Sequence, residues 1–76
     1  MYYTYVIRSI KYRRLYKGSC KDLNTRLTEH NTGKTVSTKP FLPWEIVYFE
    51  QFENFEEALK REKYFKSAAG RLIKTE

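Results

Sequence analysis

The chain has 76 residues, a net charge of +6 and a single cysteine, Cys20. A chain this short forms one domain, residues 1–76, with a small core. One cysteine cannot form an internal disulfide, and one Cys with one His falls short of a zinc site. Since it has neither an apolar stretch of about 20 residues nor a signal-peptide pattern, we expect a cytoplasmic protein.

The positive charge is concentrated in one part of the sequence. Residues 8–39 contain nine Lys or Arg against two acids, a net charge of +7, whereas residues 51–76 carry only +1. A one-sided basic field attracts polyanions such as DNA, RNA or an anionic membrane. No basic amphipathic helix with large exposed aromatics is apparent, so we favour nucleic acid over a membrane. The alternative is a surface that only maintains solubility.

The first elements read as a hairpin. Aromatic and β-branched residues predict a strand over residues 2–9, with Tyr5 and Ile7 on one face. A polar turn at residues 11–13 leads to a second strand over residues 14–19. The two strands together predict an antiparallel hairpin.

A helix and a loop follow the hairpin. Asp22 is a good N-cap, and the helix over residues 23–32 ends before Gly33. Residues 34–43 are polar and contain two prolines, which predicts a loop. Long loops in small domains more often have a functional role than serve only as connections.

The last two elements are a strand and a helix. Residues 44–52 carry the strongest strand pattern in the chain. Asn54 caps a second helix with Glu57 in the capping-box position, and this helix extends to Ala69 before Gly70. The order strand-strand-helix-strand-helix predicts an α+β fold with helices packed on a small, mainly antiparallel sheet.

Two polar residues lie on the apolar face of the first predicted helix. At 100° per residue, His30 falls between Leu23 and Leu27, and Arg26 flanks them. The face that should pack on the sheet therefore presents an arginine and a histidine. The alternative is that both side chains lie at the edge of a narrow apolar stripe, with their polar ends in solvent.

The second predicted helix places a carboxylate in its apolar stripe. Glu62 lies within the stripe that contains Phe55 and Phe65. A buried carboxylate without a partner is costly, so a cation must meet it or it must face a cavity. The cation is a metal ion, Arg26, or Lys66 in an i,i+4 ion pair. A lone carboxylate suits Mg²⁺, which keeps most of its waters.

Five residues supply the groups that phosphodiester hydrolysis needs. A carboxylate-bound metal neutralises phosphate charge and activates water, an arginine stabilises the equatorial oxygens, and a tyrosine or histidine takes a proton. Tyr5 and Tyr16 are on the two hairpin strands, where either is equally an ordinary core aromatic. Our hypothesis is that both converge with Arg26, His30 and Glu62 on one face.

The ordered motifs resemble the GIY-YIG nuclease superfamily. Residues 3–5 (YTY) followed by residues 16–18 (YKG) resemble its GIY and YIG pair. Arg26 and His30 resemble the family's R-x-x-x-H on the first helix, and Glu62 within A-L-x-x-E resembles its metal-binding glutamate. The resemblance covers nearly the whole chain.

The match is closest to the short, single-domain bacterial members of the superfamily. Residues 61–71 resemble their ending, R-E-K-Y-x-K-S-x-x-G-R. Two positions depart from the motifs: the glycine of GIY is Tyr3, and the central isoleucine of YIG is Lys17. Some repair-nuclease relatives carry a lysine just after YIG, where this chain has Ser19.

The resemblance implies a three-stranded mixed sheet flanked by helices. It also implies a metal-dependent endonuclease that hydrolyses DNA phosphodiesters, structure-specific and acting in DNA repair or recombination. Tyr16 would be the general base or would position the attacking water, and Tyr5 would hydrogen-bond in the same site. Arg26 would bind the scissile phosphate, and Glu62 would hold one Mg²⁺ or Mn²⁺ ion. A tyrosine base has a reference pKa of about 10, which the metal and Arg26 would lower.

The expected partner is DNA, with RNA as the alternative, and we expect no small-molecule cofactor and no membrane. The expected phosphate contacts are Lys17, Lys21, Arg26, Lys34 and Lys39, together with the loop over residues 33–43. Such contacts give weak sequence preference. Two other functions stay open: a catalytically weak or inactive nucleic-acid-binding module on the same basic face, and a protein-interaction module whose charge only serves solubility.

Overall fold

A β-hairpin opens the fold. The computed structural model describes residues 1–67, and in it strand β1 (Tyr2–Ser9) pairs with strand β2 (Leu15–Cys20) in antiparallel register. The two-residue alternation places Tyr5 on one face of β1 and Thr4 on the other, and both side chains are buried. The predicted hairpin is confirmed.

Helix α1 (Leu23–Asn31) follows the hairpin. It begins at Asp22, whose carboxylate accepts the backbone N–H of Thr25 at 3.1 Å. Gly33 follows the helix with a φ of +80°, a left-handed conformation that glycine adopts without strain. The predicted helix over residues 23–32 is confirmed to within one residue.

Strand β3 (Trp44–Phe52) has the bounds that the sequence predicts and pairs with the free side of β1. The loop that precedes it, predicted over residues 34–43, contains one short 3₁₀ helix, η1 (Lys39–Phe41). The 3₁₀ helix brings Phe41 against the core, where it packs with the apolar residues of the α1 side.

Helix α2 (Phe55–Lys66) closes the described part of the chain. The Asn54 side chain accepts the backbone N–H of Glu57 at 2.9 Å, which confirms the predicted cap. The prediction that the helix continues to Ala69 is wrong, because Ser67 has an extended conformation and caps the helix after Lys66; Gly70, the predicted stop, lies outside the described residues. Within residues 1–67, no helix is long and apolar enough to cross a membrane.

The strand order is β2-β1-β3, and both ladders are antiparallel. The α+β class and the order of elements are confirmed, whereas the pairing differs from the mixed sheet that the family resemblance implies. The reason is topological. Helix α1 returns the chain to the end where β2 began, so β3 runs parallel to β2, but β1 lies between them. Each neighbouring pair is therefore antiparallel.

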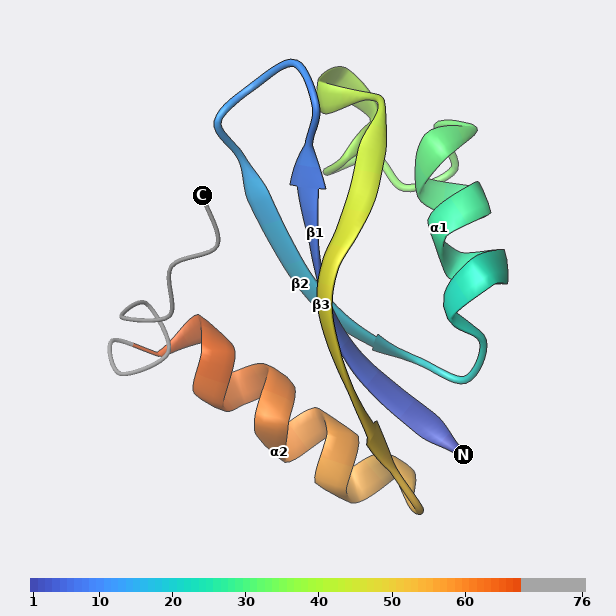
Figure 1. Ribbon diagram of the computed structural model, residues 1–76, viewed down its shortest axis with the longest axis vertical. Helices are drawn as coiled ribbons and strands as arrows, with labels where there is room; N and C mark the ends of the chain where they lie inside the picture. The colour runs from blue at the N-terminus through green and yellow to red at the C-terminus, as the bar shows by residue number, and fades with distance from the viewer. Residues whose placement is uncertain (68–76) are drawn as a thin grey trace.

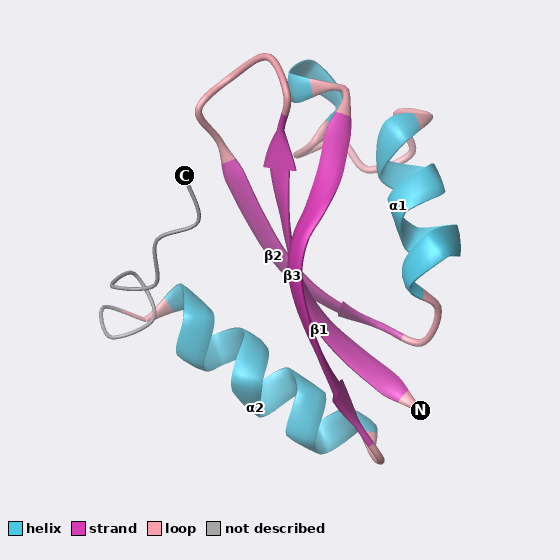
Figure 2. Ribbon diagram, in the orientation of Figure 1, coloured by secondary structure: helices cyan, strands magenta, loops and turns pink. Residues whose placement is uncertain are grey.

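The two helices cover opposite faces of the sheet (Figure 1). The three strands pass between them with a pronounced twist (Figure 2). On the α1 side, Tyr5, Ile7 and Trp44 form a buried cluster. On the α2 side, Ala58 and Phe65 of the helix are buried. Within residues 1–67, β2 pairs with a strand on one side only, which makes it an edge strand of the sheet.

Candidate active site

Two α1 side chains meet a tyrosine of β1 beneath the helix. The Tyr5 hydroxyl lies 2.9 Å from Nε2 of His30, and Nε of Arg26 donates to the same hydroxyl at 3.4 Å. Tyr5 and His30 are fully buried, while the Arg26 side chain is 39% exposed. The spacing of Arg26 and His30 on one helix face, predicted from the sequence, thus brings both onto the buried end of Tyr5.

The hydroxyl of Thr38 fixes the direction of this hydrogen-bond chain. Thr38 Oγ1 lies 3.3 Å from the carbonyl oxygen of Thr35, to which it donates, and we therefore assign it as the acceptor of the Nδ1 proton of His30, 2.9 Å away. Nε2 of His30 is then unprotonated and accepts from the Tyr5 hydroxyl, whose oxygen accepts from Arg26. Among residues 1–67, the four buried polar side chains, those of Thr4, Ser9, His30 and Thr38, all make hydrogen bonds.

Burial sets the charge state of the network. It raises the pKa of Tyr5 to about 12, a rise that the hydrogen bond from Arg26 opposes. Burial, followed by the nearby charge of Arg26, lowers the pKa of His30. The hydrogen bonds to Tyr5 and then to Glu29 hold the pKa of Arg26 above its usual value. At neutral pH the network therefore contains a neutral phenol, a neutral imidazole and one guanidinium charge.

Arg26 keeps part of its guanidinium available. Its Nη1 pairs with Glu29 at 2.9 Å, and its Nε is bonded to Tyr5. Within residues 1–67, its Nη2 has no protein partner. An arginine held at two of its nitrogens presents the third in a fixed direction, which suits recognition of a phosphate oxygen.

Tyr16 joins the same group from β2. Its ring stands edge-on to His30, with centroids 5.0 Å apart, and lies 6.4 Å from the ring of Tyr5. Unlike Tyr5, its hydroxyl has no hydrogen-bond partner in the described part of the chain. The Tyr16 hydroxyl is therefore available to a ligand, whereas that of Tyr5 is committed to its neighbours.

Glu62 lies on the other face of the sheet. Its Oε1 accepts from the Ser19 hydroxyl at 2.6 Å, and its Oε2 pairs with Nζ of Lys66 at 2.8 Å. The i,i+4 ion pair, one of the alternatives for this carboxylate, is thus present. Ser19 pairs with Thr4 in the β-ladder and shares its face, opposite to that of Tyr5.

The hypothesis that all five residues converge on one face is therefore corrected. The structure brings together four of them, Tyr5, Tyr16, Arg26 and His30, on the α1 face. Glu62 is separated from them by β2, because α2 follows β3 and packs on the opposite face. A helical wheel identifies the inward side of a helix but not the sheet face that the helix covers.

A hollow at the end of β2 is lined by one residue of the α1-face group and by the serine that holds Glu62. It has a volume of about 500 Å³, and both Arg26 and Ser19 line it, together with Cys20 and Lys21. Ser19 is the residue that holds Glu62. A strand of nucleic acid laid across this edge would have Arg26 on one side of β2 and the Ser19–Glu62 pair on the other.

The residues around Glu62 fit a hydrated divalent ion with one protein ligand. Within residues 1–67, no group of three or more His, Cys, Asp or Glu side chains forms a metal cluster. The Glu62 side chain is only 19% exposed and already holds a cation, the ammonium of Lys66, whose own side chain is 52% exposed. The carboxylate therefore accommodates positive charge, and its present partner is free to move into solvent.

The predicted phosphate contacts do not form one patch. Lys21 lines the hollow with Arg26. Lys17 pairs with Val6 and lies on the α2 face, Lys34 lines a separate hollow on α1, and the methylenes of Lys39 pack along Gly33. Of the five predicted contacts, two, Lys21 and Arg26, share a surface with the candidate site.

Sequence reasoning missed two residues of the site. Thr38 directs the His30 tautomer from the loop, and Ser19 holds Glu62. Neither has a periodic signal, because a loop threonine and a strand serine are usual at such positions. The one available signal for Ser19 was its place directly after the YKG segment, at the position where some relatives carry a lysine.

Comparisons with known proteins identify the family of this chain. The GIY-YIG catalytic domain family matches residues 1–75. A UPF0213 protein of Staphylococcus epidermidis is 46% identical over 54 residues, which are 70% of this chain and 66% of that protein, so the chain spans just under two thirds of this relative. A UPF0213 protein of Staphylococcus saprophyticus is 39% identical over 67 residues, 87% of this chain and 80% of that protein. No solved structure matches. The chain therefore belongs to the GIY-YIG family, whose catalytic domain is a nuclease domain.

Proposed function

We propose that this chain is a metal-dependent endonuclease that hydrolyses phosphodiester bonds of DNA. The observation that supports this most directly is the arrangement around Arg26. A buried network holds its guanidinium toward an open hollow, and the unbonded hydroxyl of Tyr16 belongs to the same group. A fixed cation beside an available proton acceptor is what attack of water on a phosphodiester needs.

Each residue of the network has a distinct task in this proposal. Arg26 binds the scissile phosphate through Nη2 and stabilises the charge that develops on its oxygens. Tyr16 positions or deprotonates the attacking water. Tyr5 and His30 are positioning residues, because the high pKa of Tyr5 keeps it a neutral phenol whose hydrogen bonds orient Arg26. A role for Tyr5 as a phenolate base is not part of the proposal.

Glu62 is the residue that would hold the metal. A Mg²⁺ or Mn²⁺ ion there would neutralise phosphate charge and lower the pKa of a bound water. Ser19 orients the carboxylate through Oε1 and thereby leaves Oε2, now paired with Lys66, as the oxygen for the ion. Lys21, at the mouth of the hollow, contributes a further phosphate contact. A structure-specific role in DNA repair or recombination stays a prediction that a substrate panel tests.

Cleavage is the measurement that decides the proposal. The purified chain is incubated with branched, single-stranded and duplex DNA and with RNA, each with Mg²⁺, Mn²⁺ or EDTA. We expect metal-dependent cutting of DNA that Glu62→Ala abolishes. Glu56→Ala is the matched control, because it removes an exposed carboxylate from the same helix. Binding without cutting, equal in all three proteins, would instead identify a nucleic-acid-binding module without nuclease activity.

A further inference from the structure

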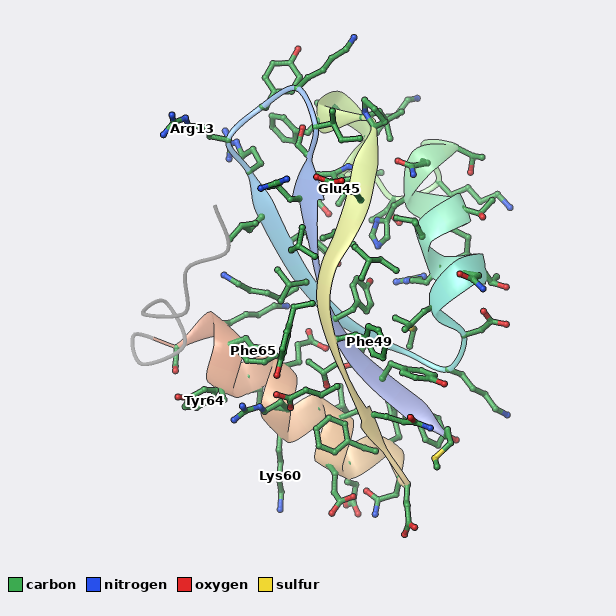
Figure 3. All side chains as sticks on the ribbon, viewed as in Figure 1. Arg13, Glu45, Phe49, Lys60, Tyr64 and Phe65 are labelled. Carbon is green, nitrogen blue, oxygen red and sulfur yellow. The ribbon has the colours of Figure 1, made fainter. Side chains whose placement is uncertain are left out.

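The tip of the β1–β2 hairpin, residues 10–14, is a cluster of positive charge. It contains Lys11, Arg13 and Arg14 and no acidic residue. Glu45, an acid that lines the same hollow as these cations, is already paired with Arg8 at 2.6 Å. Figure 3 shows Arg13 projecting outward from the tip, away from the sheet. Such a cluster at one end of the domain attracts a polyanion.

An exposed aromatic ring stands among these charges. Tyr12 is 52% exposed, and its ring meets the ring of Phe41 edge-on with centroids 5.7 Å apart. The guanidinium of Arg14 lies 4.5 Å from the centre of the same Phe41 ring. Tyr12 also lines, with the three cations, a hollow of about 540 Å³. An aromatic face surrounded by cations is the arrangement that proteins use to stack an unpaired base and hold its phosphates.

The tip is held in place before any ligand binds. The buried hydroxyl of Ser9 donates to the carbonyl oxygen of Phe41 at 2.8 Å and accepts the backbone N–H of Tyr12 at 3.0 Å. The backbone N–H of Ile10 donates to the carbonyl oxygen of Pro43 at 2.9 Å. Hydrogen bonds therefore hold the hairpin tip against the end of the loop over residues 34–43. This lowers the entropic cost of binding a ligand at the tip.

The tip and the candidate active site lie along one strand. Strand β2 begins with Leu15, directly after the tip, carries Tyr16 next, and ends at the hollow with Arg26. At about 3.3 Å per residue, the strand spans roughly 17 Å, the length of about five nucleotides along one strand of a duplex. A nucleic acid that follows the edge of β2 therefore reaches both places.

We propose that the hairpin tip is a second nucleic-acid contact that selects substrates with an unpaired strand beside the scissile phosphodiester. Tyr12 stacks on an unpaired base, and Lys11 and Arg13 contact the adjacent phosphates. This inference rests on the proposed nuclease function and adds the substrate class: single-stranded or forked nucleic acid rather than continuous duplex. The stacking contact is sequence-tolerant because every base has an aromatic face.

The test compares binding of labelled single-stranded, forked and duplex oligonucleotides without divalent metal. Tyr12→Leu should weaken binding of the single strand and the fork about five-fold or more and change duplex binding little. A 2-aminopurine in the single strand should be quenched by the unchanged protein and less by Tyr12→Leu. The double variant Lys11→Ser, Arg13→Ser should reduce the slope of log affinity against log salt by roughly 1.4 for single strands.

The chain offers matched controls on α2. Tyr64 is 41% exposed and, like Tyr12, packs with a Phe ring near an Arg, so Tyr64→Leu should leave binding unchanged. The pair Lys60→Ser, Lys63→Ser removes two exposed lysines and should change the salt slope less than the tip pair. Figure 3 shows Lys60 pointing away from the sheet at the opposite end of the molecule. Thermal melts establish that each variant is folded.

Two results would overturn the inference: tip variants that bind all three oligonucleotides as the unchanged protein does, or a tip that binds anionic phosphatidylserine vesicles in preference to oligonucleotides. Cleavage separates this failure from failure of the proposed function. Metal-dependent cutting with tip variants that bind normally would leave the nuclease and remove the tip contact. Tip-dependent binding without cutting by the unchanged protein would leave the tip contact and remove the nuclease.

Discussion

Gly18 lies directly against the phenol of Tyr5. The two residues are partners in the β1–β2 ladder, and a Cβ atom at position 18 would stand 2.5 Å from the Tyr5 hydroxyl oxygen and 2.8 Å from Cζ. The glycine of the YKG segment is thus needed for space. It lets the Tyr5 hydroxyl lie between His30 and Arg26, so the motif glycine and the arginine are parts of one arrangement.

We therefore predict that Gly18→Ala displaces Tyr5 and destabilises the domain by about 1–3 kcal/mol, because overpacking a filled site forces side chains to shift. Cleavage should fall as well, since Arg26 loses its partner. Urea unfolding measures the first effect. In the double variant with Tyr5→Phe the hydroxyl is gone and part of the clash with it, so the combined loss should be smaller than the sum of the single losses. Strictly additive losses would contradict this coupling.

The two tyrosines of the site should respond differently to loss of their hydroxyls. Tyr16→Phe should abolish or strongly reduce cleavage with little change in stability, because the Tyr16 hydroxyl has no partner among residues 1–67. Tyr5→Phe should lower the free energy of unfolding by about 1–3 kcal/mol, because it leaves Nε2 of His30 buried without a donor. Unfolding curves and cleavage rates of both variants test the distinction. Equal losses of stability would show that the two hydroxyls are not used differently.

Thr38 should act on the site through His30. Thr38→Val removes the acceptor of the Nδ1 proton at a buried position, and we expect a loss of about 1–3 kcal/mol in stability. Thr38→Ser keeps the hydroxyl and should retain most of the stability of the unchanged protein. The chain has one histidine, so its ring nitrogens can be followed directly by NMR. The unchanged protein should show the Nδ1-protonated tautomer, and the valine variant a shift away from it. An Nε2-protonated ring in the unchanged protein would refute the assigned direction of the chain.

Stability should fall in mild acid because of His30. Burial lowers its pKa below the value of 6.5 that it has when unfolded. The unfolded state therefore binds the proton more readily, so stability is fully present above about pH 6.5 and is lost as the pH falls toward the depressed folded value. Unfolding measured between pH 7.5 and 5 should show this loss. In His30→Gln, which is less stable at neutral pH, the dependence over the same range should be weaker. If the pH dependence of stability is the same in His30→Gln as in the unchanged protein, titratable groups other than His30 cause the loss of stability in acid.

The parts of the fold that follow from local signals could be predicted from the sequence. The strand over Trp44–Phe52 and the caps at Asp22 and Asn54 depend on residue type and spacing within one segment. The apolar stripe of α2 was less well predicted. Phe55 and Leu59 are 44% and 36% exposed, because the three-stranded sheet within residues 1–67 is narrow and reaches few positions of the helix.

The candidate site depends on pairing that no single segment encodes. Arg26 and His30 could be placed on one helix face, and Tyr5 and Tyr16 on hairpin strands, from periodicity alone. The face that Glu62 occupies required knowing which side of the sheet α2 covers. The role of Thr38 depends on a loop conformation held by Trp44, whose indole N–H donates to the Thr38 carbonyl at 2.9 Å. Such tertiary contacts produce no periodic pattern in the sequence, so they could not be predicted from it.

The ion pair between Glu62 and Lys66 leads to a prediction about metal affinity. Lys66 occupies the carboxylate oxygen that a divalent ion would need, so Lys66→Met should lower the Mg²⁺ concentration for half-maximal cleavage. An i,i+4 pair on a helix is worth about 0.3–0.5 kcal/mol, which corresponds to roughly a two-fold change. Lys63→Met removes a neighbouring exposed lysine from the same helix and is the matched control.

Binding of the ion can be observed without cleavage. Paramagnetic Mn²⁺ should broaden the NMR signals of Ser19, which touches the Glu62 carboxylate at 2.6 Å, at lower concentration in Lys66→Met than in Lys63→Met. Glu62→Gln keeps an oxygen for the Ser19 hydroxyl but removes the charge, and the broadening should disappear. If Mn²⁺ broadens Ser19 equally in the Gln variant, the ion is held by other groups, and Glu62 is then a structural partner of Ser19 and Lys66 alone.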